Sequence, residues 1–155
     1  MIRLLLLLLS FSIASKELKP LEELLNVEMD VNTGTIFLLK KCAGLATLLS
    51  DEDDDNWDIL SMGFLRSAVW FYLEDKEQLS SEESQKILDV LYPEYLKEVY
   101  DFAEEYGVSV RNINPEDYEG KPPAFQLVDD DVTLCLEVAE MEIVKNLTEI
   151  DLTNQ

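Results

Sequence analysis

Apolar residues recur at helical intervals through most of the chain, and this periodicity constrains the fold more than any other feature of the sequence. Side chains three or four positions apart lie on the same face of a helix. The clearest run is Trp57, Leu60, Phe64, Ala68 and Phe71. Similar apolar faces occur within residues 33–49, 80–92, 93–106 and 130–147. The pattern predicts an all-α domain, a bundle of four to five helices.

Capping residues and helix breakers set the expected boundaries. Asn32 or Thr33 can cap the first long helix. Pro93 is expected to end or bend a helix near Tyr92, and Gly107 to end the helix that follows. Residues 107–128 contain glycine and several prolines without a helical repeat, so we expect an irregular loop there. The segment over residues 57–75 is apolar around so much of its circumference that it is expected to lie centrally.

The first fifteen residues have the three parts of a secretory signal peptide. Arg3 provides a basic start, an unbroken run of leucines follows, and small residues come after Ile13. The small-x-small rule favours cleavage after Ala14, with cleavage after Ser15 as the alternative. The apolar run is shorter than the roughly 20 residues that a membrane-spanning helix needs, so an uncleaved anchor is the less favoured interpretation.

The chain is therefore expected to consist of a signal peptide over residues 1–15 and a single acidic helical domain over residues 16–155. The domain would be exported, to a periplasm or to the extracellular medium, and would not associate with a membrane after cleavage. The sequence does not predict an oligomeric state.

Two cysteines, Cys42 and Cys135, are the only ones in the chain. An even pair in an exported protein favours a disulfide over two buried thiols. Each cysteine falls on or beside the apolar face of its predicted helix. A bridge would tie the first long helix of the bundle to the last.

Acidic residues dominate the charge of the chain. Its 33 aspartates and glutamates exceed its 12 lysines and arginines, for a net charge of −21. Such a surface repels nucleic acids and anionic lipids and favours cations and basic partners. A solvated surface that serves only solubility is the alternative.

The chain contains no histidine. This absence excludes histidine-based catalytic triads and imidazole zinc sites, and with no CxxC motif a catalytic thiol is not expected. Paired carboxylates could still act as acid and base, so a carboxylate-based hydrolase stays as an alternative.

A short acidic run is the one sequence motif that resembles a metal-binding site. Asp51, Asp53 and Asp55 match the first three oxygen positions of a calcium loop, but Asn56 and Met62 stand where the loop needs its glycine and its bidentate glutamate. Calcium is the only cofactor this pattern indicates, at low affinity. A solvated loop between helices is the favoured alternative.

Tyrosines mark a possible ligand or partner surface, since tyrosine is favoured at interfaces. They are Tyr92, Tyr95, Tyr106 and Tyr118. Ordinary packing at the core and its rim is the alternative. The favoured function is a non-enzymatic binding module, with a protein that bears a basic or apolar patch, or a small apolar molecule held between helices, as its ligand.

Overall fold

The computed structural model describes residue 21 and residues 30–50, 56–76, 79–111 and 123–152. These residues form five helices and no strand: α2 (Val31–Leu49), α3 (Asn56–Glu74), α4 (Ser81–Arg111), α5 (Pro123–Ala139) and α6 (Glu142–Leu152). The predicted all-α bundle is confirmed.

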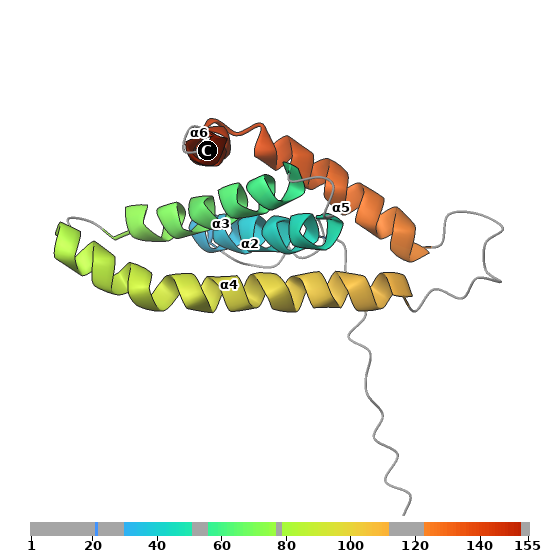
Figure 1. Ribbon diagram of the computed structural model, residues 1–155, viewed down its shortest axis with the longest axis horizontal. Helices are drawn as coiled ribbons and strands as arrows, with labels where there is room; N and C mark the ends of the chain where they lie inside the picture. The colour runs from blue at the N-terminus through green and yellow to red at the C-terminus, as the bar shows by residue number, and fades with distance from the viewer. Residues whose placement is uncertain (1–20, 22–29, 51–55, 77–78, 112–122, 153–155) are drawn as a thin grey trace, which may run out of the picture.

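The helices are arranged in three layers (Figure 1). The middle layer is formed by α2 and α3, which pack together most extensively and run antiparallel. The long helix α4 covers one side of this pair, while α5 packs on α2 and α6 on α3 from the other side. Both middle helices are thus covered by neighbours on several sides, as their apolar composition requires.

The start of α2 lies slightly earlier than the sequence indicated. Asp30, not Asn32 or Thr33, is the N-cap, and its carboxylate accepts hydrogen bonds from the backbone N–H and the hydroxyl of Thr33 at 2.9 and 2.6 Å. These bonds lower the pKa of Asp30. An aspartate satisfies the first free N–H groups as well as asparagine does and also favours the positive end of the helix dipole.

The helix α4 does not end at either expected breaker. It continues through Pro93 and Gly107 to Arg111, with a bend in its first third (Figure 1). Pro93 is exposed, whereas Leu91 and Tyr95 on either side of it are buried against the same core. Packing on both sides of the proline keeps the helix continuous, because the free energy lost with the missing backbone hydrogen bond is smaller than the free energy gained by burying Leu91 and Tyr95.

The last predicted helix, over 130–147, is instead two helices. The chain turns at residues 140–141, where the N–H groups of Glu140 and Met141 bond to carbonyls three residues earlier. The irregular region is also shorter than the expected 107–128, because residues 107–111 belong to α4 and residues 123–128 to α5. Residues 112–122 lie outside the described part of the chain.

The core centres on the middle of α2, where every residue from Leu39 to Ala46 is buried. Leu21, from before the first described helix, is also fully buried. The other large core side chains come from α3, α4, α5 and α6: Phe64, Leu65, Val99, Tyr106, Val138 and Val144.

Two glycines allow helices to approach closely. A Cβ atom at Gly44 of α2 would lie 2.6 Å from the Cβ of Phe102 and 2.9 Å from the carbonyl oxygen of Val99, both on α4. A Cβ at Gly63 of α3 would lie 2.0 Å from the hydroxyl of Thr148 on α6. The glycines therefore determine how near α4 and α6 come to the middle layer.

We expect Gly44→Ala to lower the free energy of unfolding by about 1–3 kcal/mol, as overpacking does, because α4 has to move to admit the methyl group. Gly34, in the first turns of α2, has open space around it and is the matched control. Gly34→Ala should raise the stability by up to about 1 kcal/mol, since alanine favours a helix. Urea denaturation of both variants checks this, and equal effects would contradict the close contact.

Candidate functional site

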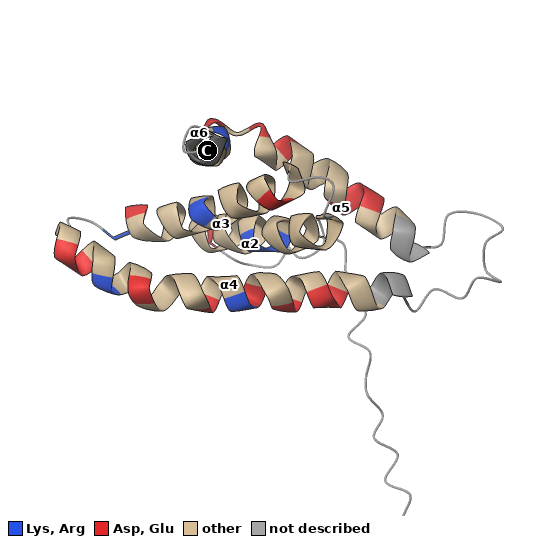
Figure 2. Cartoon of the chain, in the orientation of Figure 1, with Lys and Arg blue, Asp and Glu red and all other residues tan. Residues whose placement is uncertain are grey.

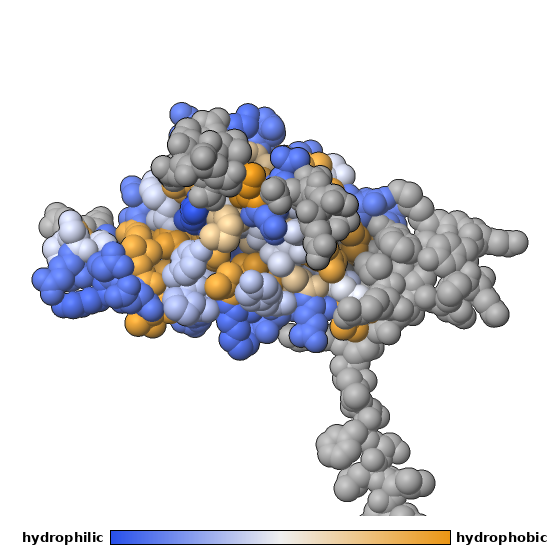
Figure 3. Space-filling model, in the orientation of Figure 1, coloured by the Kyte–Doolittle hydropathy of each residue, from blue (hydrophilic) through white to orange (hydrophobic). Residues whose placement is uncertain are grey.

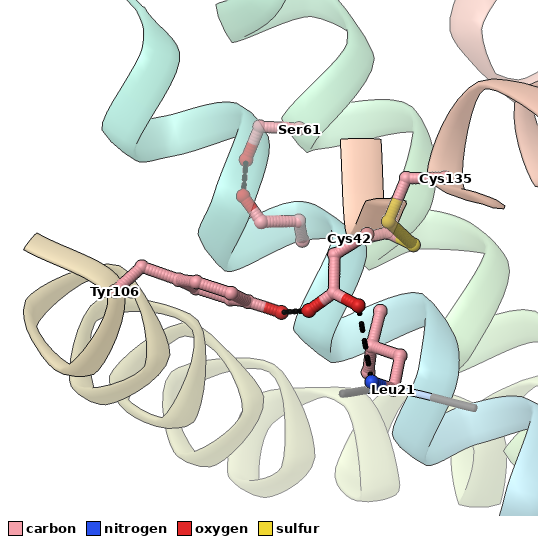
Figure 4. Close-up of a disulfide and its surroundings, with 7 residues drawn as sticks. Leu21, Cys42, Ser61, Tyr106 and Cys135 are labelled. Carbon is pink, nitrogen blue, oxygen red and sulfur yellow. Dashed lines mark hydrogen bonds between the residues drawn. A yellow bond between two sulfur atoms is a disulfide. The ribbon is translucent and has the colours of Figure 1, made fainter. Parts of the chain in front are cut away.

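A disulfide joins α2 to α5, so the predicted Cys42–Cys135 bridge is confirmed (Figure 4). The two Cα atoms lie 5.4 Å apart, and both cysteines are buried. No free cysteine remains in the chain. The bridge closes a long loop and ties α5, which makes few other contacts with α2 and α4, to the centre of the bundle.

Next to this bridge, α2 carries two lysines inside the bundle. Lys40 lies against α4, where its ammonium group bonds to the carboxylate of Glu98 at 2.5 Å and lies 4.3 Å from the centre of the Tyr95 ring. Only 11% of the Lys40 side chain is exposed. A cation so placed requires both the carboxylate and the aromatic face to replace its lost hydration.

Lys41 is buried more deeply, with 4% of its side chain exposed. Its ammonium group bonds to the carboxylate of Glu105 at 2.8 Å and lies 4.3 Å from the ring centre of Phe102 and 5.4 Å from that of Tyr106. Removing one partner of such a buried pair leaves an uncompensated charge, which costs about 3–5 kcal/mol. The two lysines thus bind α2 to α4.

A buried aspartate connects three parts of the chain beside the disulfide (Figure 4). One carboxylate oxygen of Asp131 accepts a hydrogen bond from the hydroxyl of Tyr106 at 2.7 Å, and the other accepts one from the backbone N–H of Leu21 at 3.0 Å. Asp131 is 2% exposed and precedes Cys135 by one helical turn on α5. The carboxylate therefore holds Leu21, α4 and α5 together.

Burial shifts the pKa values of this group. It raises the pKa of Asp131, against the opposing effects of the hydrogen bonds from Leu21 and Tyr106 and of the charge of Lys41. Burial, together with the neighbouring Asp131, also raises the pKa of Tyr106 far above its ordinary value. The pKa of Tyr95 rises to about 12 through burial and the charge of Glu98. Both tyrosines therefore stay protonated and act as hydrogen-bond donors or packing groups.

Of the tyrosines expected on a binding surface, the three that the structure describes do not form one. Tyr95 and Tyr106 are 7% and 1% exposed and belong to the core, and Tyr92 is partly buried with its hydroxyl 3.9 Å from the sulfur of Met62. This corrects the expectation for these residues, because their apolar rings fill the space between α4 and the middle layer. Tyr118 lies outside the described residues.

The predicted calcium residues Asp51, Asp53 and Asp55 also lie outside the described part of the chain, so that site stays a prediction. Among the residues that the structure describes, no group of three or more cysteine, aspartate or glutamate side chains is arranged to hold a metal ion. Trp57 and Asp58 follow in the first turn of α3, where the negative charge of the aspartate interacts favourably with the helix dipole.

Sequence reasoning missed Lys40, Lys41 and Asp131. The two lysines stand within an otherwise apolar run over residues 36–46, and this is the signal that could have identified them as buried. Asp131 stands at the start of the predicted helix over 130–147, but α5 begins earlier, at Pro123, and this places the aspartate well inside the helix.

Acidic residues outnumber basic ones along α4 and α5 (Figure 2), and most of them are exposed. In the described part of the chain the exposed basic side chains are four lysines, Lys76, Lys86, Lys97 and Lys145. Exposed carboxylates outnumber them on α4 and α5 alone. Seven large apolar side chains are also exposed in this part, three of them on α4: Val90, Tyr100 and Val108.

No known family model matches this sequence, and no match was found among curated proteins or solved structures. None of the helices in the described residues is both long enough and apolar enough to span a membrane.

Removing the disulfide should destabilise the protein strongly. For a sequence separation of 93 residues, chain entropy predicts that Cys42→Ala with Cys135→Ala lowers the free energy of unfolding by about 4–5 kcal/mol. Urea denaturation of the oxidised protein and the double variant measures the difference. A loss below about 1 kcal/mol would mean that α5 is held by its other contacts.

Asp131 should make stability depend on pH in an unusual direction. Because folding raises its pKa above the ordinary 3.8, its contribution is fully present below that pH and is lost as the pH rises through the folded value. The free energy of unfolding of the original protein minus that of the Asp131→Asn variant should therefore fall as the pH rises from about 4 toward neutrality. Urea midpoints across this range test it. A stability difference between the two proteins that stays constant across this range would contradict the raised pKa of Asp131.

Proposed function

We propose that this chain is an exported, non-enzymatic module that binds another protein through its acidic surface. The observation that carries the proposal is the division of charged side chains between the inside and the outside of the bundle. Inside, Lys40, Lys41 and Asp131 are all engaged with other parts of the fold. Outside, carboxylates are in large excess over lysines.

The interior charges have structural partners that leave them little capacity for chemistry. Both carboxylate oxygens of Asp131 accept hydrogen bonds, and each buried lysine faces a carboxylate and an aromatic ring. Within the described residues, no buried side-chain nitrogen or oxygen atom lacks a hydrogen-bond partner. A general acid or base needs a proton-accepting atom open to a substrate, so these groups support a structural role better than a catalytic one.

The exterior supports a basic protein as the ligand. An excess of carboxylates repels nucleic acids and anionic membranes and attracts positively charged surfaces. Such complementarity accelerates association and selects among partners, while exposed apolar side chains supply most of the affinity. The surface of this protein combines both kinds of group.

Export is supported by two independent features. The first fifteen residues have the composition of a signal peptide. The Cys42–Cys135 disulfide is a kind of link that persists outside the cytosol, where no reducing system removes it.

Purification of the tagged protein from its native source tests both parts of this proposal. We expect an N-terminus at Ser15 or Lys16 and a co-purifying basic protein that rebinds the isolated chain in calorimetry, more weakly at higher salt. A protein recovered from the cytosol with Met1 retained would refute export. A protein that isolates alone, or whose purified partner fails to rebind, would refute the binding function.

A further inference from the structure

The outward side of α4 has the composition of a protein interface. Its exposed side chains, here called the outer face of α4, are Val90, Glu94, Lys97, Tyr100, Asp101, Glu104 and Val108. They lie opposite the buried Leu91, Tyr95 and Val99, which pack on the middle layer. In Figure 1 no other described helix covers this side of α4.

Apolar groups on the outer face are large and well exposed. Tyr100 is 59% exposed and Val90 is 69% exposed, with Val108 at 39%. Tyrosine is one of the residues that contribute most to protein–protein affinity. Residues 97, 100, 104 and 108 follow one another at intervals of three or four, so Tyr100 lies on the same line of the helix surface as its charged neighbours.

The charges around these apolar groups are mainly negative. Glu104 follows Tyr100 by one helical turn, Glu94 and Asp101 are further exposed carboxylates of the outer face, and Lys97 is paired with Asp101 at 2.5 Å. Within the described chain, Glu94 and Glu104 make no ion pair. Along the edge of the molecule where α4 lies, hydrophilic and hydrophobic side chains alternate (Figure 3).

We propose that the outer face of α4 is the interface for a basic protein, with Tyr100 at its centre. This inference rests on the proposed function and names the surface that performs it. The charge pattern selects the partner, because a second copy of this acidic chain or an anionic membrane would be repelled, whereas lysines and arginines would pair with Glu94 and Glu104. Tyr100, with Val90 and Val108, would then be buried against apolar side chains of the partner.

The corresponding face of α5 provides a matched control. Leu136 is 47% exposed and stands next to the exposed Glu137, so the pair resembles Tyr100 and Glu104 in exposure and charge. This pair belongs to α5, which lies on the other side of the middle layer from α4 (Figure 1). Substitutions at both places change the same properties of the surface without touching the core.

Photo-cross-linking followed by rebinding tests the interface. A photoreactive phenylalanine analogue is placed at position 100 or 136 of the mature, oxidised protein, which is then exposed to the exported protein fraction of its source. The cross-linked protein is identified, purified and used as the probe. We expect a basic protein cross-linked at position 100, with an affinity that falls at least about tenfold in Tyr100→Ala and Glu104→Lys. Leu136→Ala and Glu137→Lys should stay within about twofold of the original affinity.

The possible results separate this inference from the proposed function. A basic partner that depends on Leu136 or Glu137 instead would overturn the α4 interface while leaving the proposed function. A neutral or acidic partner would overturn both. Cross-linking to a second copy of this chain would likewise overturn both. If neither position captures a protein that rebinds, both proposals fail. Circular dichroism of each variant confirms that the helices are retained.

Discussion

The fold depends on two lysines that α2 places inside the bundle. A buried ammonium group is tolerated only when a carboxylate and polarisable groups replace its water, so Lys40 and Lys41 require Glu98 and Glu105 of α4 at their sides. Sliding or rotating α4 on α2 would break these ion pairs and leave charges in an apolar core. The close approach at Gly44 is part of the same arrangement. Together these contacts determine which side of α4 is buried and which side is exposed.

A second set of polar contacts attaches α5 to this pair of helices. Asp131 bonds to Tyr106 of α4 and to the backbone of Leu21, one turn from the disulfide that ties α5 to α2. The helix packs less extensively on its neighbours than α3 or α4 does, so the covalent and hydrogen-bonded links matter more for its position. The ionisable groups of the interior thus hold helices together, and the proposed recognition of a partner involves the exposed carboxylates and apolar residues instead.

Much of the fold could be predicted from local patterns. The errors occurred at residues whose structure depends on contacts with parts of the chain that are distant in sequence. The helical class and the Cys42–Cys135 pairing were predicted because periodicity and cysteine count are properties of the sequence alone. Pro93 was expected to end or bend a helix, and α4 bends but continues because buried residues on both sides of the proline pack on one core. Gly107 was expected to end the helix, but α4 continues to Arg111. The turn at residues 140–141 has no glycine or proline to indicate it, and it arises because α6 packs on α3 through Gly63 and Thr148. Tyr95 and Tyr106 were candidates for a surface, yet aromatic residues on an amphipathic helix are assigned to core or surface only by the neighbouring helices.

By itself the sequence determined the helical class, the acidic charge, the cysteine pair and the leader-like start, because each depends on composition or on spacing along one segment. Only the tertiary structure decided that two lysines and an aspartate are buried, that Tyr95 lies inside while Tyr100 lies outside, and that one side of α4 stays uncovered by the described helices. The reason is physical: burial of a charge or a ring depends on partners that are distant in sequence, such as Glu105 for Lys41, and no local pattern specifies which of many carboxylates that partner is.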